Sequence, residues 1–319
     1  MARVDRRTFL ASGLALALAP ERLAAAGRPP LALVTADTEG HVAVVDLARH
    51  RVAGRVGTID GPRSIEARGR GTVIVGHASQ GAVTLLEGRP PRVRRVLRGF
   101  GEPRYAAIAP DGRHAYVTDS RNGELAVLDL QRGRVVRRAE IGAGARHVTL
   151  DRTGRTVWAA LGSSATEVVV VDVGDPARPR VRRRIRPPFL AHDVAFSPSG
   201  ARVWVTAGRE RRAAVYAADG TRPALELSAG VAPQHVAFGP LLAYLASGEG
   251  RSVAVHALDD GRLLRETRVP YGSYNVVRRA GRVLTPSLGD GTLSVLDARG
   301  LRRWHVRIAS AAHDACVVL

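Results

Sequence analysis

Histidines, arginines and acidic residues recur at two adjacent positions of a repeated, otherwise aliphatic segment of this chain. The first position is occupied by Arg63, Arg104, Arg146, His192, Gln234, Tyr274 and His313. The second position is occupied by Ser64, Tyr105, His147, Asp193, His235, Asn275 and Asp314. None of these fourteen side chains is aliphatic, and four of the chain's ten histidines are among them. If the segments lie side by side, these residues line a hydrated channel or a ligand site.

Three interpretations of this polar set remain open from the sequence. The first is a water-filled channel mouth without a ligand. The second is a site for an anionic small molecule or an acidic polymer, because Arg63, Arg104 and Arg146 come from consecutive segments and guanidinium groups bind carboxylate and phosphate. The third is a transition-metal or haem-iron site formed by histidines, with an acidic residue as ligand or support. The candidate residues for the third site are His147, His192, His235, His313, Asp193 and Asp314.

Catalysis is the alternative to binding. His192-Asp193 and His313-Asp314 could each supply a general base for lactone or ester hydrolysis. However, no Gly-x-Ser-x-Gly motif is present, and neighbouring residues of a strand point to opposite faces. We therefore expect a binding or scaffold protein rather than an enzyme, with an anionic small molecule or polymer as the expected ligand at the channel mouth. The sequence identifies no cofactor and no catalytic residue.

The elements that position these residues repeat with a period near 40. Each copy has an aromatic or large aliphatic residue at one equivalent position, followed by a polar turn and a second aliphatic strand. These residues are Leu33, Ile74, Tyr116, Trp158, Trp204, Tyr244 and Leu284. Alternating short strands with turns such as Pro110-Asp111-Gly112 predict four antiparallel strands per copy. The period predicts an all-β, seven-bladed β-propeller formed by one domain, residues 27–319.

The two ends of the repeated region predict how the ring closes. The first copy begins at its second strand, Leu31 to Asp37, and the chain finishes with a spare first strand, His313 to Leu319. Joining the two strands completes one blade and leaves no open sheet edge. Loss of the last eight or so residues should therefore unfold the ring.

Several motifs carry a family resemblance. Tyr116-Val117-Thr118-Asp119, with Ala109-Pro110-Asp111-Gly112-Arg113 before it and Leu125-Ala126-Val127-Leu128-Asp129 after it, resembles the YVTN-repeat, or YncE-like, β-propellers. The resemblance extends from Leu31 to Leu319 and is weakest in the second and sixth copies. It implies a seven-bladed, exported binding scaffold with no shared set of catalytic residues.

The first 26 residues are typical of an export signal. Arg6-Arg7-Thr8-Phe9-Leu10 precedes an apolar run that is too short to span a bilayer, and Ala24-Ala25-Ala26 follows it. The paired arginines followed by Phe and Leu resemble a twin-arginine (Tat) signal. We expect a periplasmic, extracellular or cell-surface protein without a transmembrane segment in the mature chain. The single Cys316 lies in an apolar run, which favours an inert core thiol.

The charge of the chain is strongly positive. All 48 basic residues are arginines, and the signal's net +2 leaves +17 of the total +19 for residues 27–319. The predicted outermost strands, such as Arg92 to Arg98 and Arg180 to Arg186, hold many of these arginines. They could bind an acidic cell-envelope polymer, but we favour protection of exposed sheet edges. Few aromatic residues accompany them, which argues against nucleic-acid binding, and we expect a monomer.

Overall fold

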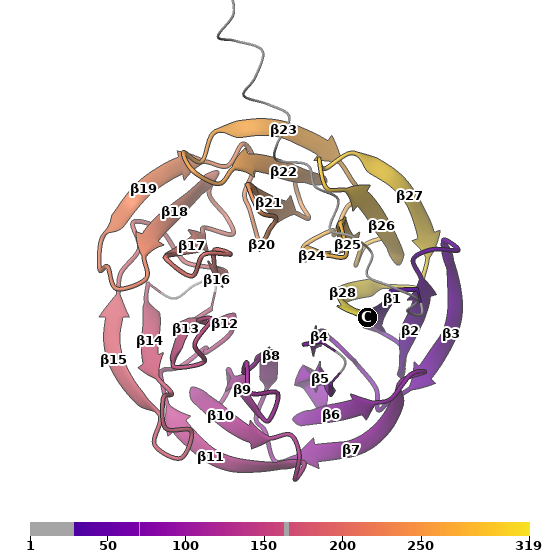
Figure 1. The fold of residues 1–319 in the computed structure, drawn as a ribbon, viewed down its shortest axis with the longest axis horizontal. Helices are drawn as coiled ribbons and strands as arrows, with labels where there is room; N and C mark the ends of the chain where they lie inside the picture. The colour runs from indigo at the N-terminus through magenta and orange to yellow at the C-terminus, as the bar shows by residue number, and fades with distance from the viewer. Residues whose placement is uncertain (1–28, 70, 163–165) are drawn as a thin grey trace, which may run out of the picture.

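A ring of seven four-stranded antiparallel sheets surrounds a central channel (Figure 1). The computed structural model describes residues 29–69, 71–162 and 166–319. Apart from a single 3-10 turn, Ala78–Gln80, every described regular element is a strand. The predicted all-β, seven-bladed β-propeller is therefore confirmed. The predicted signal, residues 1–26, lies outside the described residues.

Each blade contributes one strand to each of four concentric layers. The innermost strands are β4 (Ser64–Ala67), β8 (Pro103–Ile108), β12 (Val148–Leu150), β16 (Val194–Phe196), β20 (His235–Phe238), β24 (Val277–Arg279) and β28 (Ala312–Val318). The second strands are β1 (Leu31–Ala36), β5 (Val73–His77), β9 (His114–Asp119), β13 (Thr156–Ala160), β17 (Arg202–Thr206), β21 (Leu242–Ser247) and β25 (Arg282–Pro286). The third strands are β2 (His41–Asp46), β6 (Ala82–Glu87), β10 (Glu124–Asp129), β14 (Val168–Asp172), β18 (Arg212–Ala217), β22 (Ser252–Ala257) and β26 (Thr292–Asp297). The outermost strands are β3 (Arg51–Gly57), β7 (Arg92–Arg98), β11 (Arg134–Glu140), β15 (Arg180–Ile185), β19 (Pro223–Ser228), β23 (Leu263–Arg268) and β27 (Arg302–Arg307).

The ring closes where the two ends of the repeated region meet. β28 pairs antiparallel with β1 and gives the sheet order β28-β1-β2-β3, so Leu33 lies opposite Cys316 (Figure 1). Cys316 is buried and free, and burial raises the pKa of its thiol well above the usual range. The predicted closure is confirmed, and the thiol has the inert environment that its apolar neighbours predicted.

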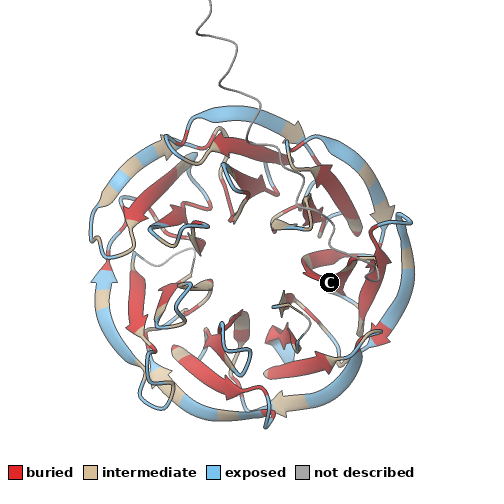
Figure 2. Ribbon diagram, in the orientation of Figure 1, coloured by how far each residue is buried: buried red, intermediate tan, exposed pale blue. Residues whose placement is uncertain are grey.

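The hydrophobic core lies between adjacent blades. The second and third strands are almost wholly buried, whereas the outermost strands face solvent (Figure 2). Side chains at the predicted aromatic position fill these interfaces. The ring centroids of Trp158 and of Tyr216 in the next blade lie 6.0 Å apart, and those of Trp204 and Phe238 lie 5.8 Å apart. Large side chains at one equivalent position therefore hold neighbouring blades together.

In several blades, the threonine of the repeated motif links the innermost strand to the next blade. The Thr118 hydroxyl accepts a bond from the Tyr105 backbone N–H (3.2 Å) and donates to the Arg146 carbonyl of the following blade. Thr206 accepts from the Asp193 N–H (3.1 Å) and donates to the Gln234 carbonyl (2.8 Å). The polar part of the motif therefore fixes the backbone at the channel mouth.

The outermost strands carry the predicted arginines, and many of these are paired with acidic residues of the adjacent third strand. Arg94 contacts Glu87 at 2.6 Å, and Arg138 contacts Glu124 at 3.1 Å. Exposed pairs of this kind contribute little to stability. Within the described residues, no helix is long and apolar enough to cross a membrane.

Candidate metal centre

A polar cavity occupies the channel between the innermost strands. Its volume is about 180 Å³, which leaves room for several water molecules. All seven residues of the second repeated position line it: Ser64, Tyr105, His147, Asp193, His235, Asn275 and Asp314. The alignment made from sequence therefore identified the residues that face the channel.

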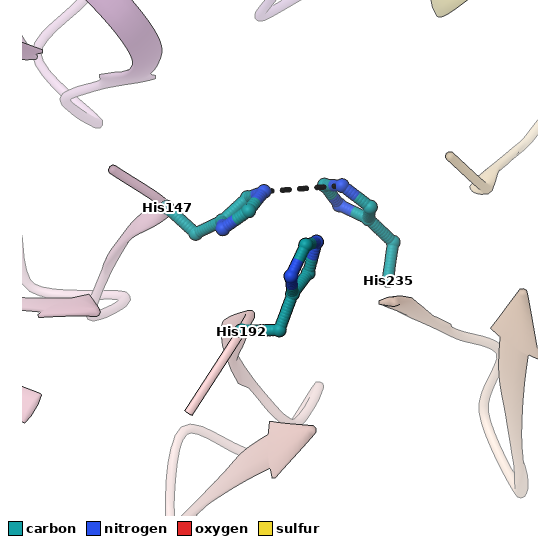
Figure 3. Close-up of side chains that lie close together, drawn as sticks. All are labelled: His147, His192 and His235. Atoms are coloured by element: carbon teal, nitrogen blue, oxygen red, sulfur yellow. Dashed lines mark hydrogen bonds between the residues drawn. The ribbon is translucent and has the colours of Figure 1, made fainter. Parts of the chain in front are cut away.

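Three histidines from three consecutive blades converge (Figure 3), and two of them, His147 and His235, line this cavity. The potential ligand nitrogens of His147, His192 and His235 all lie within 4.8 Å of one another. The Nε2 atoms of His147 and His235 are 3.1 Å apart. Two nitrogens bonded to a tetrahedral zinc ion at about 2.0–2.1 Å lie roughly 3.3 Å apart, so small side-chain rotations would bring the cluster to metal-binding distances.

Backbone pairing holds the three histidines at the ends of their strands. Beyond the ends of β12 and β16, the backbone pairing continues: the Ala160 N–H donates to the His147 carbonyl (2.9 Å), and the His192 N–H donates to the Thr206 carbonyl (2.8 Å). Gly208 has φ +74°, and a Cβ there would lie 2.6 Å from the Cβ of His192. A glycine at this position therefore leaves space for the His192 side chain.

Asp193 and Tyr105 surround the cluster. The Asp193 carboxylate lies 3.4 Å from Nδ1 of His235, so a proton on Nδ1 would leave the lone pair of Nε2 available to an ion. The Tyr105 hydroxyl lies 3.4 Å from Nε2 of His235, and its ring centroid lies 4.2 Å from that of His147. Burial raises the pKa of Tyr105 to about 12, so the phenol remains protonated at neutral pH.

The electrostatic environment keeps His147 and His192 neutral. Burial lowers the pKa of His147 well below the usual range, and the neighbouring His235 and His192 lower it further. Burial, His235 and Arg146 lower the pKa of His192 in the same way. Metal ligation needs neutral imidazole, so His147 and His192 require little proton release before an ion binds.

Three other predicted residues lie outside the cluster. Nδ1 of His313 donates to the Arg63 carbonyl (2.8 Å), which places this histidine between two blades. The Asp314 carboxylate accepts bonds from the N–H groups of Ile65 and Ala315 at 2.9 and 2.8 Å. Tyr274 packs its ring against Gly248. His313 is thus not among the converging histidines, because its ring is used to join β28 to the next blade.

The three predicted arginines are held differently from one another. Arg63 pairs with Asp37 at 2.8 Å, and Arg104 pairs with Glu102 at 3.2 Å. Among the described residues, Arg146 has no acidic partner. The Nε atoms of Arg104 and Arg146 are buried without a hydrogen-bond partner. Local carboxylates therefore neutralise only part of the predicted anion site.

Glu66 lines the cavity and was not predicted from sequence. It lies two residues after Ser64 on β4, so both side chains point to the channel. The sequence signal that could have identified Glu66 is a charged residue within an otherwise largely aliphatic inner strand.

Comparisons with known proteins support the fold alone. No family model matches the chain, and no curated protein matches its sequence. The structure resembles hydrazine synthase of Kuenenia stuttgartiensis with a TM-score of 0.70 and 17% identity over 84% of this chain and 92% of that chain. It resembles a functionally unknown protein from Desulfotomaculum acetoxidans DSM 771 with a TM-score of 0.79 and 12% identity over 90% and 98% of the two chains. Apo AztD from Citrobacter koseri gives a TM-score of 0.70 and 11% identity over 91% and 97%. Membership of the YVTN-repeat family therefore stays a prediction.

Proposed function

We propose that this protein is an exported propeller that binds a divalent transition-metal ion in its channel through His147, His192 and His235. The convergence of three imidazoles from three blades within 4.8 Å carries this proposal. Imidazole ligands suit zinc, copper, nickel and iron. Export rests on the twin-arginine-type sequence in residues 1–26.

The three-histidine ligand set favours a site that binds and releases an ion over a site that holds a structural ion. Structural zinc sites are closed by four protein ligands, whereas three ligands leave one coordination position open. The three histidines lie beside a cavity with room for water or a small ligand. We therefore assign the protein a role as a metal-binding or metal-carrying scaffold. No residue is assigned a catalytic role.

Binding of an anionic small molecule is a second candidate. Its supporting observation is Arg146, which has no acidic partner among the described residues and whose Nε is buried without a hydrogen-bond acceptor. Hydrolysis of a lactone or ester by His192-Asp193 receives no such support, because the Asp193 carboxylate pairs with His235 rather than with His192.

Metal titration of single variants tests the proposal. We expect metal-free protein to bind one Co²⁺ or Zn²⁺, and His147→Ala, His192→Ala and His235→Ala each to weaken binding at least about 100-fold. Exposed His305 on β27 provides the control, His305→Ala, which should bind like the unmodified protein. Competition with a chromophoric chelator measures the affinity. Equal affinity of His147→Ala and the unmodified protein, with matching circular dichroism, would refute the site.

A matched pair of variants separates ligand support from blade packing. Asp193 accepts bonds from the N–H groups of Val194 (2.8 Å) and Val236 (3.1 Å). Asp314 makes the corresponding pair of bonds, to Ala315 of its own strand and to Ile65 of the next blade. Only Asp193 also contacts a histidine of the cluster. Asp193→Asn should therefore weaken metal binding about 10–100-fold, whereas Asp314→Asn should affect stability more than metal affinity.

A further inference from the structure

Two arginine side chains at the channel mouth have donor groups without acceptors. The Nε atoms of Arg104 and Arg146 are buried and make no hydrogen bond. Glu102 contacts only the NH1 end of Arg104, and Arg146 has no acidic partner among the residues that the structure describes. A buried donor without an acceptor is costly, particularly when it belongs to a charged group. The two side chains are therefore suited to bind an anion.

Mutual repulsion of the arginines supports the same conclusion. Burial lowers the pKa of Arg104, and the charges of Arg146 and Arg63 lower it further. The positive charges of Arg146 and Arg63 thus act on the Arg104 guanidinium. An anion between Arg104 and Arg146 would relieve this repulsion. Planar guanidinium groups bind planar carboxylate-type groups through paired hydrogen bonds, which makes such an oxyanion the best match.

Arg146 adjoins the histidine cluster, because its positive charge acts on both His147 and His192. Arg146 directly precedes His147, and the Thr118 hydroxyl fixes the Arg146 carbonyl. Three histidines leave one position of a tetrahedral ion open, and carboxylate oxygen is a normal fourth ligand. The acidic residues Asp193 and Asp314 line the cavity, whereas the arginines belong to the preceding repeated position at the mouth. A ligand that approaches the ion from the mouth therefore meets positive charge.

We propose that the channel mouth binds its metal ion together with a small planar oxyanion, a carboxylate or carbonate, that pairs with Arg104 and Arg146 and completes the coordination of the metal. This inference rests on the proposed metal site. It makes the two ligands thermodynamically linked: if the oxyanion raises the metal affinity by some factor, the metal raises the oxyanion affinity by the same factor.

Co²⁺ titration with and without oxyanion tests this linkage. The unmodified protein is titrated at constant ionic strength in perchlorate, and again with bicarbonate or malonate added. Because free oxyanions also complex Co²⁺, each affinity is corrected for the concentration of free Co²⁺. We expect at least about a 10-fold gain in Co²⁺ affinity and a change in the visible absorption of bound Co²⁺. A gain with only one of the two probes identifies whether carbonate or a carboxylate is the preferred ligand.

Arginine variants locate the effect. Arg104→Gln and Arg146→Gln should still bind Co²⁺ but lose the gain from oxyanion, whereas Arg134→Ala on the outer strand β11 should retain it. If neither oxyanion changes the Co²⁺ affinity of the unmodified protein, this inference is overturned, but the proposed metal site is not. Retention of the full gain in both glutamine variants also overturns it. Failure of the unmodified protein to bind Co²⁺ overturns the metal site and the inference together.

Discussion

At the residue scale, Glu66 is a carboxyl group that the metal site does not use. It lines the channel cavity and faces Asp314 of β28, Arg279 of β24 and Arg68 of its own strand end. Burial and the charge of Asp314 raise its pKa to about 8, and the two arginines only partly oppose this. Glu66 is therefore largely protonated at neutral pH, and its ionisation is disfavoured by the folded ring.

The raised pKa of Glu66 predicts a pH-dependent stability. Its carboxyl binds a proton more tightly in the folded chain (pKa about 8) than in the unfolded chain (4.5). The stability that this protonation adds to the folded chain is therefore fully present below pH 4.5 and is lost as the pH rises toward 8. Glu66→Gln should thus increase the free energy of unfolding by about 1 kcal/mol or more at pH 8, since one pKa unit corresponds to about 1.4 kcal/mol. At pH 4.5 the variant and the unmodified protein should differ little.

Urea unfolding at pH 4.5, 6 and 8 measures this difference. Exposed Glu140, at the end of β11, supplies the control Glu140→Gln, which should show no such dependence. A constant difference between Glu66→Gln and the unmodified protein across this range would contradict the assigned role of burial.

At the element scale, local sequence chemistry specifies each blade. In the Pro110-Asp111-Gly112 turn, the Asp111 carboxylate accepts bonds from the N–H groups of Arg113 (2.8 Å) and His114 (3.0 Å). The following strand, β9, is then buried along almost its whole length. These signals act over a few residues, so they could be identified without knowledge of the ring. The motif threonines add links between blades, which the repeat alone did not reveal.

Deletion of β28 tests the closure of the ring. This strand pairs with β1 and buries Ala312, Ala315 and Val317 against the first and last blades. We expect removal of residues 312–319 to abolish cooperative unfolding, because the lost contacts rival a total stability of about 5–15 kcal/mol. Circular dichroism melting and limited proteolysis report the result. Removal of Leu319 alone, which lies beyond β28, is the control, and a truncated chain that melts within a few degrees of the control contradicts the closure.

At the scale of the whole molecule, positive charge is spread around the circumference. The outermost strands face solvent, and their arginines are only partly paired with acidic residues of the third strands (Figure 2). A field of this sign attracts polyanions without requiring a shaped site. The same charges keep exposed strand edges from pairing with other chains, which is the role we favour for them.

Salt dependence separates the two roles of the basic circumference. If edge protection is the main role, binding to an anionic polymer should be weak, should fall steeply with salt, and should disappear by about 0.5 M, where screening is short-ranged. Retention on a polyanion column at increasing salt measures this. Persistent binding at 0.5 M salt would instead indicate a specific polymer site.

The seven blades, the closing strand and the seven polar positions that line the cavity could be predicted from the sequence, because strand and turn signals are local and repeat with the blades. The tertiary structure alone decided which of these side chains meet. His147, His192 and His235 converge, whereas His313 bonds the Arg63 carbonyl between two blades. These outcomes depend on ring orientation and on contacts between residues more than 40 positions apart, for which a single sequence carries no local signal.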